Sequence, residues 1–431
     1  MKNDLLRHWG LCGVLIFWLV LLAINVLDLF PGVRFRGIRY HGPDFDQYYT
    51  AGVVAQERLW HGLYPPDMGT ASTPHGATLH PDVAAELARR QATSRVNNVA
   101  PPPLAVFAIP LAMLPFHMAY KAFAAVQFLA TLWFLLLFRK ECDEFRLPPN
   151  LANALVLVVG TGLPVCESLM LANSTTFVAL ATILALRSVR HSQTASSVFA
   201  FALAGLLKGF SAVWVPALVI WKRWRTILWG AVCGTIILTM PHLLGAGLDV
   251  WQRFFSDVLH TANGTPYWIG DQNLGLPSFF AWLYPNCPMP RPLSVVLAVG
   301  QPILLVAAYT LGWRASRFGE TLAMGLSLFL ATLSFQLFSP HCWPHYAFNV
   351  VGFLPLAFSA SGVRTGCRLH GIQWFYVVIV ALAFALSWFP IGNAAKYVCH
   401  APILGFGRTF GYLLMLFWGF VTLIHMAFHH E

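Results

Sequence analysis

Long apolar runs constrain the fold of this chain more than any other sequence feature. Runs of about 18 or more apolar residues recur between short basic loops, and each can cross a hydrocarbon core about 30 Å thick. Hydrophobic residues make up 57% of the sequence and charged residues only 10%, which excludes an ordinary soluble domain. The sequence therefore predicts an all-α polytopic membrane protein whose residues 1–431 form a single membrane-embedded domain.

Basic residues set the predicted topology. Lys2 and Arg7 precede the first apolar run, which we interpret as an uncleaved span with the amino terminus in the cytoplasm. Alternating spans between basic loops then give about twelve transmembrane helices with both termini inside. Two large periplasmic loops remain, residues 31–103 and 245–291. The net charge of +10 is spread over short loops, as topology signals are, so we expect no nucleic-acid partner.

The first large loop carries its own predicted helices. Residues 47–60 and 81–95 have helical character, and residues 104–115 are apolar but interrupted by Pro110. The last segment has only about a dozen residues, too few to span a bilayer, so an interfacial helix is expected. The loop is therefore predicted to lie along the membrane, next to lipid substrates.

Two carboxylates, Asp44 and Asp46, stand at the start of this loop helix among aromatic residues. Such carboxylates are scarce here, because the whole chain contains only 17 acidic residues. A carboxylate beside a membrane face can take the proton from an incoming hydroxyl group. Aspartate is also a preferred N-cap residue, so both side chains can instead cap a helix over residues 47–60. Taken alone, the residues leave both interpretations open.

Lys208 occupies an unusual position between two basic clusters that are both expected inside. The apolar stretch 197–221 must cross twice, and two halves of about 12 residues reach only about 18 Å each. We therefore predict two short helices or a re-entrant hairpin with residues 208–211 at its tip. A lysine at membrane depth lines a polar cavity or meets an anion. The alternative is a lysine that snorkels to the surface beside a structural break.

Residues 339–346, SPHCWPHY, form a turn rich in proline and tryptophan with His341 and His345 at its outer face. These histidines can act in function or serve as hydrogen-bonded packing residues. Their spacing, broken by Pro344, is a weak zinc signal, and we predict neither a metal nor a cofactor. The eight cysteines lack metal-ligand spacing, and a disulfide stays open among three of them, Cys287, Cys342 and Cys399.

Together these motifs resemble the family 87 glycosyltransferases, membrane enzymes of the GT-C class. Residues 44–48, DFDQY, match the family's aspartate four residues before a tyrosine, and residues 101–104 with 114–116 match its proline-rich stretch. Residues 208–210, KGF, match its lysine before an aromatic residue. Residues 339–346 match its Ser-Pro-x-Ser-Trp-x-His-His motif, with tyrosine in place of the second histidine. Residues 172–175 and 271–274 are reduced forms of two further motifs.

The resemblance implies a GT-C fold and a polyprenyl-phosphate sugar donor. It also implies transfer of a mannose-like sugar, with inversion, to a lipid or glycan hydroxyl at the periplasmic face of the bacterial inner membrane, among membrane lipids. In this interpretation Asp44 is the base, since its spacing to Tyr48 matches the family, and Asp46 is the second candidate. Donor phosphate and sugar would be bound by Lys208, His345, His341, Tyr48, Asn173 and Gln272.

Two other function classes fit parts of the pattern. A transporter or lipid flippase suits twelve spans, broken helices and an intramembrane lysine. We see no repeat between the halves, however, and the carboxylates lie at the outer surface rather than at mid-membrane. A polymerase or ligase of lipid-linked glycans would have the same kind of polytopic helical fold, but it usually has a longer periplasmic loop late in the chain.

Overall fold

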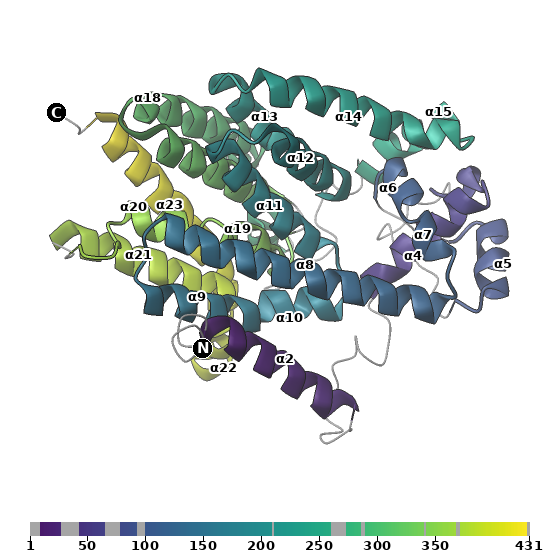
Figure 1. The fold of residues 1–431 in the computed structure, drawn as a ribbon, viewed down its shortest axis with the longest axis horizontal. Helices are drawn as coiled ribbons and strands as arrows, with labels where there is room; N and C mark the ends of the chain where they lie inside the picture. Colours follow the sequence, from purple (N-terminus) through teal and green to yellow (C-terminus); the bar gives the residue numbers. More distant parts are fainter. Residues whose placement is uncertain are drawn as a thin grey trace.

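The computed structural model describes residues 9–26, 43–64, 78–92, 100–208, 211–259, 273–285, 289–339, 342–367 and 371–428. Within these ranges every regular element is helical (Figure 1). The helices form one bundle, with a group of short helices gathered at the end where α8 begins, on the right of Figure 1. The prediction of an all-helical chain is thus confirmed for the described residues.

The short helices, together called the distal layer, come from the two predicted outer loops and from the apolar segment 104–115 that follows the first loop. The layer comprises α4 (Pro43–Gln56), η1 (Trp60–Gly62), α5 (Pro81–Arg89), α6 (Pro102–Phe107), α7 (Ile109–Ala112) and α15 (Leu248–Arg253), followed by the π-helix η3 (Phe254–Leu259). The two loops pack on each other: the indole of Trp60 donates to the carbonyl of Leu244 at 2.9 Å, and Arg253 donates to the carbonyl of Tyr64 at 3.1 Å.

Among the described residues, the first half of the bundle contains one helix before α4 and seven between α7 and α15. They are α2 (Trp9–Val26), α8 (Phe116–Glu144), α9 (Pro149–Thr161), α10 (Leu163–Met170), α11 (Thr175–Arg190), α12 (Thr194–Lys208), α13 (Ser211–Ile220) and α14 (Trp224–Leu243). The two short helices expected over residues 197–221 are present as α12 and α13, which contact each other on either side of residues 209–210.

The second half contains α17 (Leu276–Leu283), α18 (Arg291–Phe338), η4 (Pro344–Ala347), α19 (Phe348–Val351), α20 (Leu354–Ala360), α21 (Gly371–Trp388), α22 (Ile391–Val398), η5 (Pro402–Phe406) and α23 (Gly407–Phe428). The 48 residues of α18 are not one straight rod, because the backbone leaves helical geometry at Gly319. Its two arms fold onto each other, since the Ser327 hydroxyl donates to the carbonyl of Ala308 at 3.1 Å.

Five helical segments of the described chain are long and apolar enough to cross a membrane, namely Phe116–Glu144, Pro149–Met170, Trp224–Leu243, Arg291–Phe338 and Pro402–Phe428. Their outward faces carry large apolar side chains, and on α14 Leu228 is 64% exposed and Leu243 81% exposed. Exposed apolar surface of this extent fits a lipid environment. The chain is a helical membrane protein, whereas the count of about twelve spans stays a prediction.

Arginines that the sequence suggested as topology signals also hold two helices together. At the far end of α8 from the distal layer, Glu141 is fully buried and accepts from Arg187 at 2.7 Å and Arg190 at 2.8 Å. Glu144 also accepts from Arg187, at 2.6 Å. Because a buried carboxylate is stable only when it is paired, these ion pairs tie α11 to α8 as well as marking a side of the membrane.

Two local predictions need correction. The first loop helix begins at Pro43, not at residue 47, so Asp44 and Asp46 lie inside its first turn rather than capping it. Proline suits a first helical position because its fixed φ is helical and it has no N–H to satisfy. The disulfide left open above does not join Cys342 to Cys399, since both are free, and Cys287 lies outside the described residues.

Candidate active site

The first turn of α4 docks on the connection between α10 and α11. The side-chain amide of Asn173 donates to Oδ2 of Asp44, and the backbone N–H of Asp44 donates to the carbonyl of Leu171 at 3.3 Å. One turn along α4, the phenol of Tyr48 accepts from the backbone N–H of Ser174 at 3.2 Å. Residues four apart share a helix face, so Asp44 and Tyr48 present one polar face to this connection.

Asn173 is itself held in one orientation. Its side-chain oxygen accepts from the backbone N–H of Thr175 at 2.8 Å and from the Thr175 hydroxyl at 2.5 Å. The amide nitrogen of Asn173 is therefore left to face Asp44. Asn173 is only 4% exposed, and a buried, fixed amide sets the direction of the carboxylate that it contacts.

Gln127 of α8 holds the connection between α10 and α11 in place through hydrogen bonds. Its side-chain amide donates to the carbonyls of Ser168 at 2.8 Å and Asn173 at 2.7 Å, and the Gln127 side chain is fully buried. The hydroxyls of Ser168 and Thr176 lie 2.9 Å apart and close the same turn. Sequence reasoning missed Gln127, although a glutamine inside a predicted span is a signal of an internal polar contact.

The residues of η4 lie against α10, on the same side of the bundle. His345 is 3% exposed, and its ring meets that of Tyr346 edge to face with centroids 4.8 Å apart. Burial raises the pKa of Tyr346, and the negative charge of Asp44 raises it further, so this phenol lies within electrostatic reach of the Asp44 carboxylate. The histidine motif therefore packs on α10, and the aspartate motif packs on the end of the same helix.

A second segment fixes the approach to η4. The side-chain oxygen of Asn273 accepts from the backbone N–H of Cys342 at 2.9 Å and from that of Gly275 at 3.2 Å. The backbone N–H of Leu274 donates to the carbonyl of Cys342 at 2.6 Å. The reduced motif 271–274 therefore reaches the site through Asn273, one residue after the predicted Gln272.

The end of α12 reaches the same region. Leu206 and Leu207 pack against the small apolar cluster formed by Tyr48, Ala100 and Leu104. The backbone of Lys208 follows directly, so the predicted intramembrane lysine ends a helix that contacts α6 and packs against the apolar cluster that contains Tyr48.

A charged residue of α10 borders the site and was also missed. Glu167 is partly buried and lies within electrostatic range of Arg408, which is 5% exposed at the start of α23. A nearby positive charge offsets part of the cost of removing a carboxylate from water. The two residues are far apart in sequence, and neither stands in a recognisable motif.

The predicted residues fall into three groups. In the structure Asn173 contacts Asp44, and Tyr48 contacts the neighbouring Ser174. His345 packs on Tyr346, which lies within electrostatic reach of Asp44. Asp46 is 4% exposed and, two residues from Asp44, projects from α4 about 200° around the helix. The Lys208 side chain, His341 and Gln272 lie outside the described residues.

These features describe a membrane-embedded helical protein with a carboxylate held at the distal end of its bundle. The model of Glycosyltransferase family 87 matches residues 99–340, more than half of the 431 residues, and the chain belongs to this family. The resemblance inferred from the motifs is thereby confirmed, and the protein is a glycosyltransferase. No curated protein and no solved structure matches the chain. Asp44 and His345 lie outside the matched segment, so their roles rest on the contacts above.

Gln127 provides a test of how the site is positioned. Gln127→Leu removes the donor shared by the Ser168 and Asn173 carbonyls, which costs about 1–3 kcal/mol for the groups left unpaired. We expect a lower thermal unfolding temperature in detergent and a fall in kcat of about 10-fold. The reason is that Asn173, which orients Asp44, loses the hydrogen bond that holds its carbonyl in place. The matched control is Thr131→Val, one turn along α8, whose hydroxyl donates to the Gln127 carbonyl at 3.0 Å within the helix. Equal effects of the two substitutions would contradict a positioning role for Gln127.

Proposed function

We propose that this glycosyltransferase moves a mannose-like sugar from a polyprenyl-phosphate donor to a hydroxyl of a lipid or glycan acceptor, with inversion at the anomeric carbon. The observation that carries the proposal is the contact between Asp44 and the oriented amide of Asn173. Tyr346 of η4 lies within electrostatic reach of this carboxylate, and its ring packs on the buried His345. The contact fixes one carboxylate at the end of the bundle where a lipid-borne donor can enter.

The chemistry requires one base. Asn173 binds Oδ2 of Asp44, which leaves acceptor capacity on the carboxylate for the hydroxyl proton of the acceptor. As the acceptor oxygen bonds to the anomeric carbon, the bond from that carbon to the phosphate oxygen breaks, and the electron pair leaves with polyprenyl phosphate. Since a phosphate leaving group needs no protonation, no second carboxyl acid is required, in contrast to a glycoside hydrolase.

Cations would stabilise the departing phosphate. Lys208, which ends α12, would supply a compact positive charge, and His345 would supply an N–H donor from the turn that also carries Tyr346. Tyr48 and Asn173 would contact the sugar or the phosphate from the α4 side, and His341 and Gln272 complete the proposed donor site.

The proposed site faces the periplasm of a bacterial inner membrane. The distal layer joins both long polar loops, whereas the arginine-rich ends of α8 and α11 lie at the opposite end of α8, as cytoplasmic ends do. In this orientation α6 and α7, which are short and rich in proline and apolar residues, lie at the interface where a polyprenyl chain would rest.

A donor panel tests the proposal. Purified enzyme is incubated with polyprenyl-phosphate mannose, glucose and arabinose and with the matching sugar nucleotides, together with a membrane lipid extract as acceptor. We expect release of polyprenyl phosphate from one lipid donor, fastest with mannose, and no nucleoside diphosphate from the sugar nucleotides. Use of a sugar nucleotide alone would overturn the donor class while leaving the family assignment intact.

A further inference from the structure

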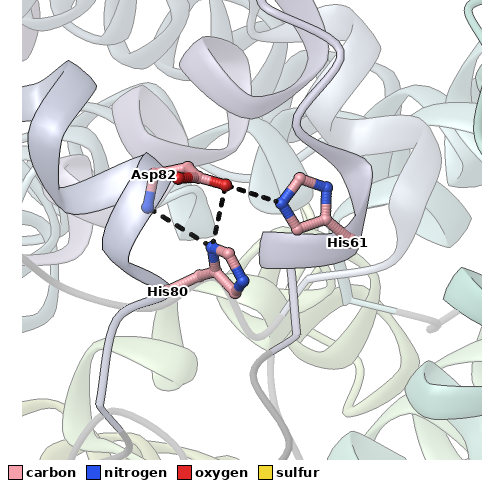
Figure 2. A group of neighbouring side chains, drawn as sticks. All are labelled: His61, His80 and Asp82. Atoms are coloured by element: carbon pink, nitrogen blue, oxygen red, sulfur yellow. Dashed lines mark hydrogen bonds and ion pairs between the residues drawn. The ribbon is translucent and has the colours of Figure 1, made fainter.

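The distal layer contains a second cluster of chemically active side chains, away from Asp44. His61 lies in η1, His80 is the N-cap residue of α5, and Asp82 is in the first turn of α5. Figure 2 shows both imidazole rings turned toward the Asp82 carboxylate, with His61 Nε2 3.1 Å and His80 Nδ1 3.6 Å from Asp82 Oδ2. One ligand atom from each residue lies within 4.8 Å of the other two.

We propose that His61, His80 and Asp82 bind a zinc-class divalent cation. Zinc bonds imidazole nitrogen and carboxylate oxygen at about 2.0–2.2 Å, and a tetrahedral site therefore holds its ligand atoms about 3.3–3.5 Å apart. Two of the three separations, 3.1 and 3.6 Å, bracket this value. The side chains are half-exposed, so a metal ion can reach the site, and a water molecule can take the fourth position.

The donor set selects the metal class. Two neutral imidazoles with one carboxylate suit zinc and its neighbours in the transition series, whereas calcium and magnesium prefer all-oxygen ligands. The ion would also take over the lone pair of His80 Nδ1, which now accepts from the Asp82 backbone N–H at 3.4 Å. That hydrogen bond is long compared with the usual 2.9–3.0 Å, so little is lost when the metal displaces it.

The surrounding backbone is built to keep η1 and the start of α5 together. A Cβ at Gly62 would lie 2.6 Å from Val83 Cγ2 and 2.9 Å from His80 Cβ, so the two segments meet where only glycine fits. The other end of α5 is tied to α4 by Arg90, which donates to Glu57 and to Gln56. A metal at His61 and His80 would add a cross-link between η1 and the start of this nine-residue helix.

The cation's role is structural rather than catalytic. Asp44 and η1 lie at opposite ends of α4, and the 14 residues of that helix span about 20 Å. A helix as short as α5 is unstable in isolation and depends on tertiary contacts. By cross-linking chain positions on either side of residues 65–77, the ion would stabilise the distal layer without touching the reacting atoms.

Metal titration tests the site. The full-length protein is purified with an affinity tag that contains no histidine, stripped with chelator, and titrated with Zn²⁺ by calorimetry and with Co²⁺ by visible absorption. We expect one equivalent to bind, a tetrahedral cobalt spectrum, and a zinc-dependent rise in the unfolding temperature. His61→Gln and His80→Gln should each lower the affinity at least about 10-fold, since even loss of an outer-shell contact has that effect.

The control variant is His191→Gln. His191 is also half-exposed and contacts a carboxylate, Glu144, at 2.9 Å, but it belongs to the ion-pair network with Arg190. Its substitution should leave zinc affinity unchanged. Unfolding temperatures of all variants in chelator should match the wild type, which shows that they fold. Zinc affinity that is equal in wild type, His61→Gln and His80→Gln, or no stoichiometric binding by the wild type, would overturn the proposal.

Discussion

Replacement of Asp44 by asparagine is expected to lower turnover by at least about 100-fold, the lower end of general-base contributions. Asparagine keeps the size of the side chain and can still accept a hydrogen bond from Asn173 through its oxygen. It cannot accept the hydroxyl proton of the acceptor at neutral pH. Turnover is measured as release of polyprenyl phosphate from the proposed donor. Donor affinity is measured separately and should be retained, because the proposed phosphate ligands are residues other than Asp44.

Asp46→Asn is the matched control, two residues along the same helix. Asp46 is buried and projects from α4 in another direction, so its substitution should reduce turnover far less than that of Asp44. An inactive Asp46→Asn beside an active Asp44→Asn would move the base to Asp46. If both variants stay active, a single-aspartate transfer mechanism is wrong for this chain.

The arrangement of the site was predictable where local sequence patterns carry it. The short pair of helices around residue 208 followed from counting apolar residues between basic clusters. That inference depends on segment length, which needs no partner to be known. The spacing from Asp44 to Tyr48 served only as a match to the family motif, and the contacts of Asp44 with Asn173 and of Tyr48 with Ser174 were not predicted.

Partners brought together by tertiary packing were not predictable. Gln127, Glu167 and Arg408 matter because of what buries them, and the groups that they meet lie tens to hundreds of residues away. The start of α4 was misplaced for a different, local reason. An aspartate before a helical segment is typical of an N-cap, but the proline at position 43 starts the helix one residue before Asp44.

Lys208→Ala and His345→Ala should each weaken donor use by roughly 10- to 1000-fold, as expected when a donor to a developing anion is lost. Both substitutions should act on kcat/KM for the polyprenyl-phosphate sugar, because charge builds on the phosphate as the sugar leaves. Lys208→Arg should recover part of the activity, since it restores the charge with a different shape.

The outcome for His345 separates a phosphate ligand from a packing residue. His345 is buried in η4, so His345→Ala leaves a cavity and can lower stability, whereas His345→Gln retains an N–H donor of similar reach. A phosphate ligand predicts partial rescue by glutamine in kcat/KM, with wild-type folding confirmed by the unfolding temperature. The control is His117→Ala, an exposed histidine in the first turn of α8, near the distal layer, which should leave turnover unchanged. Near-normal turnover of His345→Ala would assign that side chain to packing. Near-normal turnover of Lys208→Ala would contradict the proposal that Lys208 stabilises the departing phosphate.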